Sequence, residues 1–364
     1  MKASIVLGAG FGDEGKGNFV NHLTKHDPKH SIVVRFNGGH QAGHTVIHGD
    51  KRHVFSSFGS GTLNNVPTYW SKYCTVYPIG FNREYNALVK LGIDPVIYID
   101  PMCPITTPFD IICNKESEQI NGHGSCGLGF GKTVWRHETL DHSYRIFAKD
   151  LNNPWILRQK LVTLMRFYGY DRIDLIDDFI NHCNMMLERV SFAYPAILFN
   201  YDHLIFEGAQ GILLDREHGI FPHVTRSHTN SKNAIEILDY LNVEDIDVYY
   251  MTRCYSTRHG NGPFFEDVIN PNNPDETNVY NEHQGSFKIA PFYYKNLQYS
   301  IDTDRIYNIN HVLRSNRTIV VTCMDQLDQY PVYRDDLGGY DSLDRSDFKE
   351  LFPNNTIFVD KPNY

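Results

Sequence analysis

Short, uninterrupted runs of apolar and β-branched residues recur along this chain, and they constrain its fold more than any other feature. Segments long enough to form helices lie between them, notably 155–189, 230–241 and 302–316. Continuous apolar strands are typical of a sheet covered on both faces, and their alternation with helices is typical of an α/β fold. The sequence therefore predicts a mostly parallel central sheet flanked by helices. The runs lie at 4–7, 31–34, 95–99, 203–206, 247–250 and 318–321.

Composition narrows the classes of protein that this fold can serve. The 364 residues are 41% apolar and 13% aromatic, enough for one large core, so we predict a single domain over 1–364. A formal net charge of −9 disfavours nucleic acid as a partner. No stretch approaches the roughly 18 to 20 uncharged apolar residues of a membrane helix. The seven cysteines form no Cys-x-x-Cys pair. We therefore expect reduced thiols, no membrane partner and a cytoplasmic location.

A glycine-rich turn follows the first apolar run. The segment Gly8-Ala9-Gly10-Phe11-Gly12-Asp13-Glu14-Gly15-Lys16-Gly17 precedes a stretch of helical character, and in that context backbone N–H groups can hold phosphates. Lys16 is placed to reach an outer phosphate. The spacing matches neither the Walker A pattern nor a dinucleotide fingerprint, so a purely structural turn stays open on glycine content alone. Asp13 and Glu14 favour the functional interpretation, because acids repel phosphate unless a metal ion or a proton transfer requires them.

Four blocks of the sequence resemble the signatures of one family. The run Gly12-Asp13-Glu14-Gly15-Lys16-Gly17 and the segment 34–45 are similar to the first two signatures of the adenylosuccinate synthetases. The third block is 206–225 and the fourth is 256–263. The similar segments span the chain from residue 4 to about residue 325, so the resemblance covers most of its length.

The resemblance implies a reaction and assigns roles within it. Members of the family join the amine of L-aspartate to C6 of a 6-oxopurine nucleotide, after a nucleoside triphosphate has phosphorylated the oxygen on C6. By resemblance, Asp13 is the general base that removes the N1 proton and is also a Mg²⁺ ligand, while His44 polarises that oxygen and the phosphoryl group. The main-chain carbonyl of Gly43 is implied as the second Mg²⁺ ligand.

The other site residues are implied by the same motifs. The residues assigned to the nucleoside triphosphate are Gly12, Glu14, Gly15, Lys16, Gly17, Gly43, His44, Thr45 and Asp325. Those assigned to the purine nucleotide are Asp13, Gln41, Ser125, Cys126, Gln210, Thr225 and His259. Ser286 and Lys288 are assigned to L-aspartate. The family implies a homodimer, and Arg136 or Arg145 is the candidate for an arginine contributed across its interface, with an ordinary surface arginine as the alternative.

Several positions depart from the family's pattern. Lys288 is the one lysine or arginine between Asn281 and Pro291, where the family has an arginine-rich loop for the aspartate carboxylates. Cys323 replaces a lysine of the segment that contacts the triphosphate's base, which favours ATP or dATP over GTP. Cys126 replaces a threonine beside the 5′-phosphate. These departures and the short chain resemble the bacteriophage branch of the family, whose members use dGMP and supply 2-aminoadenine for phage DNA.

Two other interpretations stay open. Asp13 is retained as in enzymes that act on IMP with GTP, so an ordinary adenylosuccinate synthetase of purine biosynthesis is the first. A carboxylate can accept hydrogen bonds from both N1–H and the 2-amino group of guanine, so Asp13 does not exclude dGMP. A catalytically inactive nucleotide-binding module is the second, and the joint presence of Asp13, Lys16, His44, Gln210 and Thr225 argues against it. For a viral protein the expected location is the host cytoplasm.

Overall fold

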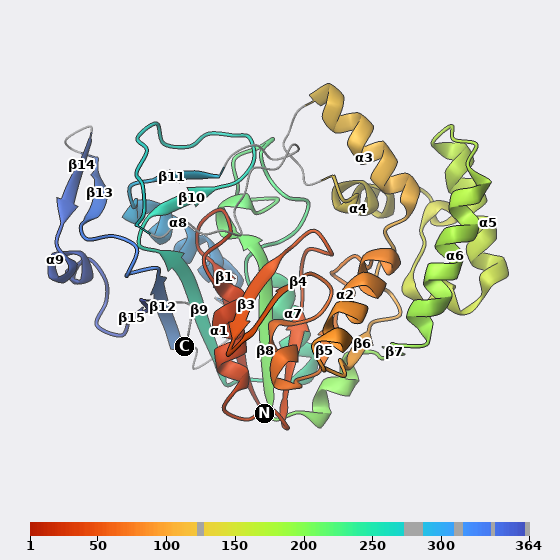
Figure 1. Cartoon of the computed structure of the whole chain (residues 1–364), viewed down its shortest axis with the longest axis horizontal. Coiled ribbons are helices and arrows are strands. Elements are labelled where there is room, and N and C mark those ends of the chain that lie inside the picture. Colours follow the sequence, from red (N-terminus) through yellow and green to blue (C-terminus); the bar gives the residue numbers. More distant parts are fainter. Residues whose placement is uncertain (122–126, 273–286, 309–315, 336–338, 361–364) are drawn as a thin grey trace.

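A nine-stranded sheet forms the centre of the molecule in the computed structural model, which describes residues 1–121, 127–272, 287–308, 316–335 and 339–360 (Figure 1). All the neighbouring strands of this sheet run parallel. The predicted α/β fold with a mostly parallel sheet is therefore confirmed. In spatial order the strands are β15 (Ile357–Phe358), β12 (Asn316–Thr322), β9 (Ile246–Arg253), β1 (Lys2–Gly8), β8 (His203–Gly211), β2 (Ser31–Arg35), β5 (Thr68–Trp70), β6 (Ile97–Ile99) and β7 (Ser191–Phe192).

Smaller strand pairs and the helices surround this sheet. The antiparallel pairs are β3 (His44–His48) with β4 (Lys51–Phe55), β10 (Ser256–Arg258) with β11 (Lys288–Ala290), and β13 (Tyr330–Arg334) with β14 (Gly339–Leu343). The helices are α1 (Lys16–Thr24), α2 (Pro78–Lys90), α3 (Pro108–Asn121), α4 (Phe130–Thr139), α5 (Pro154–Phe167), α6 (Ile173–Leu187), α7 (Lys232–Leu241), α8 (Tyr294–Arg305) and α9 (Arg345–Glu350). Short 3₁₀ helices include η1 (Ser60–Asn64) and η6 (Ile306–Asn308).

The central strands are buried on both faces, which is why they read as continuous apolar runs. Side chains alternate along a strand, so neighbours in sequence pack on opposite sides. Val6 and Val33 pack with Phe19 of α1 in one cluster, whereas Ile5 packs with Leu238 of α7 in another. A third cluster joins α2, α3, α5 and α6, and Figure 1 shows α3 to α6 gathered beyond the β6–β7 end of the sheet.

Two of the predicted helices differ from the observed ones. The segment 155–189 forms two helices, and Gly169 with φ +75° lies in the turn between them. The prediction of a helix over 302–316 is wrong at both ends, because α8 begins at Tyr294 and Asn316 already belongs to β12. Asn316 pairs with Asp247 of β9, and sheet pairing outweighs the local helical pattern there.

The parallel sheet brings five connecting segments to one edge. The chain leaves β1, β2, β8, β9 and β12 at their carboxyl ends, and ligands of open α/β sheets bind at that edge. All the sequence blocks that resemble the family signatures reach this edge. None of the helices within the described residues is long and apolar enough to span a membrane.

Candidate active site

The loop after β1 already holds an anion of its own. Glu14 Oε1 accepts hydrogen bonds from the backbone N–H groups of Gly10 (3.0 Å) and Gly12 (2.8 Å), and Glu14 Oε2 accepts one from Lys16 Nζ at 2.6 Å. The side chains of Glu14 and Lys16 are only 3% and 5% exposed. Two backbone N–H groups and the side chain of Lys16, the first residue of α1, therefore converge on a carboxylate, as a phosphate-binding loop requires.

Two glycines make this compact arrangement possible. A Cβ atom on Gly8 would lie 2.4 Å from Glu14 Oε2 and 2.7 Å from Lys16 Nζ. A Cβ atom on Gly17 would lie 2.9 Å from the Cβ atom of His44, so this glycine lets α1 approach β3. The predicted phosphate loop and the predicted His44 are thus brought together by close backbone packing.

Asp13 lies at the exposed side of the same loop. Its backbone has φ +65°, a left-handed conformation that residues with a Cβ rarely adopt. Its carbonyl oxygen accepts a hydrogen bond from Arg253 Nε at 2.6 Å, and its Oδ2 lies 3.3 Å from His259 Nε2. The side chain remains 32% exposed, so the carboxylate is accessible to a ligand. The structure therefore brings together Asp13 and His259, both of which the sequence placed at the purine nucleotide.

His44 is buried and paired with a carboxylate that the sequence analysis did not single out. His44 Nδ1 lies 2.5 Å from Glu207 Oε1, which leaves Nε2 for a ligand. Ser60 donates to Glu207 through its backbone N–H at 3.0 Å and through its hydroxyl. Burial lowers the pKa of His44, and Glu207 only partly opposes that effect. Burial alone would raise the pKa of Glu207, but His44, Arg35 and Ser60 lower it to about 2.

One signal in the sequence could have revealed Glu207. It is a charged residue directly after the continuous apolar run 203–206, in a strand predicted to be buried on both faces. A carboxylate in such a position needs a partner, because burying an unpaired charge is costly. It is 0% exposed in the structure, and its partner on β3 is 163 residues away in sequence.

Gln210 lies where the end of β8 meets the phosphate loop. Its backbone has φ +63°, and a Cβ atom on Gly12 would lie 3.6 Å from Gln210 Oε1. Asn37 fastens this region to β2, because its Oδ1 accepts from Ala209 N–H at 2.7 Å and its Nδ2 donates to the carbonyls of Ala209 (3.1 Å) and His228 (3.0 Å). The structure therefore places Gln210 beside the loop that carries Asp13.

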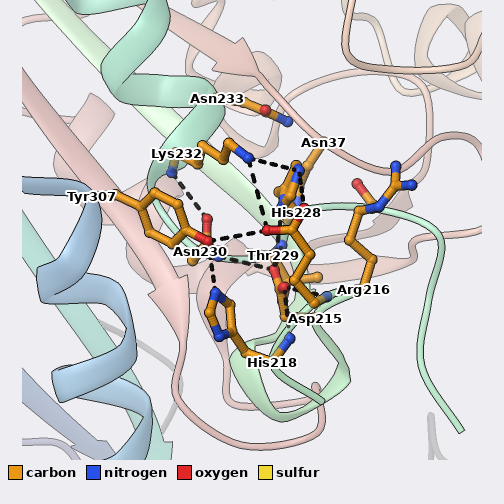
Figure 2. A network of polar contacts seen from close by, with 12 residues as sticks. Asn37, Asp215, Arg216, His218, His228, Thr229, Asn230, Lys232, Asn233 and Tyr307 are labelled. Carbon is orange, nitrogen blue, oxygen red and sulfur yellow. Dashed lines mark hydrogen bonds and ion pairs between the residues drawn. The ribbon is translucent and has the colours of Figure 1, made fainter. Parts of the chain in front are cut away.

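Asp215 lies at the centre of a network of polar contacts within the segment 215–230, which includes Thr225, and Figure 2 shows the contacts of Asp215. Asp215 is fully buried, and its Oδ2 accepts hydrogen bonds from Thr229 N–H at 2.7 Å and from Asn230 Nδ2 at 3.0 Å. The N–H group of Thr225 donates to the carbonyl of Leu214 at 2.9 Å. The bond to Leu214 therefore returns Thr225 to the residues that follow β8.

Two outer contacts tie this segment to the helices behind it. His218 Nε2 lies 2.6 Å from the hydroxyl of Tyr307 in η6, and Lys232 Nζ at the start of α7 lies 3.3 Å from His228 Nε2 (Figure 2). The predicted purine-nucleotide segment is therefore braced by α7 and η6.

Replacing Asp215 by asparagine is expected to loosen this segment. The neutral amide accepts weaker hydrogen bonds than the carboxylate, so we expect a loss of about 1 to 3 kcal/mol in the free energy of unfolding. Urea unfolding followed by circular dichroism measures it. Asp302→Asn is the control, since its ion pair with Arg305 is exposed and should contribute less than about 0.5 kcal/mol. Equal losses in both variants would contradict a supporting role for Asp215.

Thr45 and Asp325 were also predicted to bind the triphosphate, and they lie outside the loop. Thr322 Oγ1 donates to the carbonyl of Glu14 at 3.2 Å, so the last residue of β12 touches the loop, and the segment 323–326 continues from there. Asp325 belongs to that segment, and its Oδ1 is buried without a hydrogen-bond partner among the described residues. Thr45 follows His44 in β3. A contact of Asp325 with a nucleotide base stays a prediction.

Gln41 and Lys288 are two further residues that the sequence predicts to bind substrates. Both polar side-chain atoms of Gln41 are buried and lack a partner among the residues that the structure describes. Lys288 lies in β11 directly opposite Arg258 of β10. Thr257 of β10 contacts the carbonyl of Gly12 at 3.5 Å, so this strand pair lies against the phosphate loop. Lys288 is therefore on an element next to Asp13, and its contact with aspartate stays a prediction.

The oxygen atoms assigned to Mg²⁺ suit that ion chemically. Mg²⁺ prefers oxygen ligands and usually keeps phosphate oxygens and waters beside one or two protein groups. The partly exposed Asp13 carboxylate and the carbonyl of the exposed Gly43 are such ligands. No cluster of three or more His, Cys, Asp or Glu side chains suited to a metal occurs among the described residues. The pairing of Asp13 with Gly43 on one ion stays a prediction.

The prediction that Arg136 could reach across a subunit interface is wrong. Its side chain is 0% exposed and forms two hydrogen bonds with Asp110, of 2.9 Å from Nε and 2.8 Å from Nη2. It also donates to the carbonyls of Tyr144 and Ile105, at 2.7 Å each. A guanidinium held in this way joins α3 to α4. Arg145 is half-buried and donates through Nε to the carbonyl of Leu140, and it remains the candidate.

Three predicted positions lie outside the described residues. Ser125 and Cys126 were assigned to the purine nucleotide, and Ser286 was assigned to aspartate. Their roles stay predictions.

The fold and the site together define an α/β protein with an anion-holding loop after its first strand. A family model described as adenylosuccinate synthetase matches residues 5–282. This chain belongs to the adenylosuccinate synthetase family. Adenylosuccinate synthetase from Blochmanniella floridana is 30% identical over 296 residues, which cover 71% of this chain and 64% of that protein. Adenylosuccinate synthetase 1 from Pseudoalteromonas translucida is 32% identical over 284 residues, covering 72% and 63%. The chain thus spans a little under two thirds of the length of these relatives.

Two solved structures share the fold. One is a fully ligated adenylosuccinate synthetase from Plasmodium falciparum, with a TM-score of 0.70, 20% identity, and coverage of 93% of this chain and 82% of that one. The other is a succinoaminodeoxyadenylate synthetase from cyanophage S-2L, described as bound to dGMP and to dATP as an energy donor. It has a TM-score of 0.65 and 14% identity, and it covers 90% of this chain and 85% of that one.

Proposed function

We propose that this chain is a carbon–nitrogen ligase that condenses L-aspartate with the 6-oxo position of a purine nucleotide through a 6-phosphoryl intermediate. The observation that carries the proposal is the arrangement of Asp13, Lys16 and His44 around one loop. An accessible carboxylate, a buried lysine and a histidine fixed by Glu207 are the groups that this chemistry needs. A lactam oxygen is a poor leaving group, so it must be activated before an amine can displace it.

Each of these side chains has a defined task in the first step. The Asp13 carboxylate removes the N1 proton, which makes the oxygen on C6 nucleophilic. Lys16 and the loop N–H groups offset the charge on the triphosphate. Burial lowers the pKa of His44, but an arriving phosphate and the ionised Glu207 both favour the imidazolium. Nε2–H can then donate to the phosphoryl oxygens. A Mg²⁺ ion held by Asp13 and Gly43 would neutralise further charge on the triphosphate.

In the second step, the amine of aspartate displaces the phosphate from C6. Lys288 would hold a carboxylate of the incoming aspartate, together with Ser286. The purine nucleotide would be held by Gln41, Gln210, Thr225 and the region of His259, and its 5′-phosphate by Ser125 and Cys126. A phosphate release assay tests the whole proposal, because release must depend on both aspartate and a purine monophosphate.

We propose dGMP as the acceptor and ATP or dATP as the donor, with a product that serves 2-aminoadenine DNA of a bacteriophage. Three observations support this proposal. Cys323 stands in place of a lysine, and Lys288 is the one lysine or arginine of the segment 281–291. The fold is shared with a cyanophage synthetase described with dGMP and dATP. The curated relatives are named adenylosuccinate synthetases, which favours IMP with GTP as the second candidate. The chain would then act in purine biosynthesis.

A third possibility is a nucleotide-binding module without turnover. It would bind purine nucleotides and release no phosphate in the same assay. We further propose one synthetase domain, a homodimer in which Arg145 is available to the partner subunit, and a place in the cytoplasm, that of the host for a phage protein.

The identity of the acceptor is expected to be visible in the kcat/KM values of different purine monophosphates. The 2-amino group of dGMP should bond to Asp13 or a neighbouring carbonyl, and dIMP would leave that acceptor unpaired. An unpaired buried polar group costs about 1 to 3 kcal/mol, so kcat/KM for dGMP should exceed that for dIMP by about tenfold or more. Initial rates with dGMP, GMP, dIMP and IMP at fixed aspartate and ATP measure this. The highest value for IMP would make the chain an ordinary adenylosuccinate synthetase.

The donor preference is expected to follow from Cys323. A thiol in place of a lysine removes a cation that favours the oxygen of guanine, so ATP and dATP should support the reaction at least as well as GTP. Phosphate release with each triphosphate at equal Mg²⁺ measures the preference. A strict requirement for GTP would overturn this assignment and favour the IMP reaction.

A further inference from the structure

A continuous row of buried polar side chains joins Asp13 to the segment that follows β12. Arg253 Nε donates to the carbonyl of Asp13 at 2.6 Å, and Arg253 Nη1 donates to the hydroxyl of Tyr255 at 2.8 Å. The hydroxyl of Tyr255 in turn donates to Gln326 Oε1. Arg253, Tyr255 and Gln326 are 5%, 3% and 8% exposed. We call these three side chains the Arg253 relay.

At one end of the relay, the bond from Arg253 supports an unusual backbone. Asp13 has φ +65°, and a residue with a Cβ persists in this conformation only where its surroundings hold it. A charged donor on its carbonyl is a strong restraint. The direction of the Asp13 carboxylate depends on that backbone, so the relay acts on the proposed general base without occupying its carboxylate.

At the other end, Gln326 is part of the segment proposed to contact the base of the triphosphate. Its N–H donates to the carbonyl of Cys323 at 3.1 Å, and Cys323 itself has φ +62°. Asp325, whose buried Oδ1 has no hydrogen-bond partner among the described residues, lies between them in the sequence. A base that bonds to Asp325 therefore acts on the turn that positions Gln326.

The relay also borders the proposed aspartate site. The guanidinium of Arg253 lies 5.7 Å from the ring centre of Phe287. The ring centres of His259 and Phe287 are 4.6 Å apart. Phe287 directly precedes Lys288. Arg253 is thus surrounded by the elements proposed to hold all three substrates.

We propose that Arg253, Tyr255 and Gln326 are positioning residues that make the geometry of Asp13 depend on the base of a bound purine nucleoside triphosphate. The proposal rests on the proposed function, because it takes Asp13 as the base and 322–326 as the donor segment. A buried hydrogen-bond row transmits a shift because each member would otherwise be left unpaired. Donor binding then tightens the site for the purine monophosphate.

The test measures this coupling by isothermal titration of the full chain. The Kd of dGMP is measured alone, with saturating adenylyl imidodiphosphate, and with saturating inorganic tripolyphosphate, which lacks a base. We expect the analogue to tighten dGMP binding by about fivefold or more, and tripolyphosphate to do so less. In Tyr255→Phe the analogue should lose this effect, while kcat falls by about tenfold and the Kd of dGMP measured alone changes by less than about twofold.

Matched variants separate positioning from general loosening. Tyr69→Phe removes another buried tyrosine hydroxyl, bonded to Asp100 at 3.1 Å and outside the relay, and it should keep the coupling. Gln326→Glu keeps an acceptor for Tyr255 and should retain coupling, whereas Gln326→Leu should lose it. Gln326→Leu also serves if Tyr255→Phe fails to fold.

Three results would overturn the relay: no coupling in the parent protein, full coupling in Tyr255→Phe or Gln326→Leu, or an equal loss in Tyr69→Phe. The proposed function fails differently. Coupling between the analogue and dGMP, without phosphate release from any purine monophosphate, would support the relay and reject the ligase.

Discussion

Replacing Asp13 by asparagine is expected to lower kcat by about 10² to 10⁴, the usual contribution of a well-placed general base. Asparagine tolerates the left-handed backbone at φ +65° and keeps the shape of the side chain, but it cannot take the N1 proton. The fold should be unchanged, because the side chain is partly exposed on a loop. Phosphate release at saturating substrates measures kcat, and thermal unfolding checks the fold.

The control for this prediction is Asp171→Asn, an exposed aspartate between α5 and α6. It should keep the parent's rate. Near-parent activity of Asp13→Asn at neutral pH would show that another group takes the proton, and the role of Asp13 would then be limited to holding the loop.

Replacing His44 by asparagine is expected to lower kcat by about 10²-fold or more, the typical loss of one preorganised transition-state donor. Asparagine keeps a hydrogen-bond donor but cannot carry the positive charge that stabilises the phosphoryl group during its transfer. Steady-state kinetics with each substrate varied in turn separates kcat from KM. An unchanged kcat with a raised KM would make His44 a residue of ground-state binding.

Glu207→Gln provides the companion measurement for His44. Its amide oxygen can still accept from His44 Nδ1, but the charge that favours the imidazolium is lost, so kcat should also fall. Glu84→Gln is the matched control, since Glu84 is buried and accepts backbone hydrogen bonds from Ser56, Ser57 and Phe58 away from the loop. It should lower the melting temperature without lowering kcat. Equal losses of kcat in both variants would contradict an orienting role for Glu207.

The central strands could be predicted from sequence because both faces of the sheet are covered. Strands β1, β2, β8, β9 and β12 therefore carry continuous apolar runs. The edge strands β7 and β15 contain two residues each, too short for any pattern. The end of the predicted helix over 302–316 failed for a related reason: the strand that begins at Asn316 is specified by its partner β9, which is distant in sequence.

The site was predictable where its chemistry is local. Glu14 and Lys16 are two residues apart and bind each other, so the loop could be identified from one short run. Glu207 and Arg253 are 163 and 240 residues from the groups they hold, and local spacing carries no information about such pairs. Arg136 was mistaken for a surface residue because its burial depends on Asp110, which lies on another helix.

The internal carboxylate of the phosphate loop changes what nucleotide binding means for this chain. Glu14 already satisfies the N–H groups of Gly10 and Gly12 and the charge of Lys16. A phosphate that takes up these donors exchanges one anion for another, so the affinity reflects the difference between the two rather than the full attraction. Because these bonds order the loop before the nucleotide arrives, nucleotide binding does not have to offset the loss of the loop's conformational entropy.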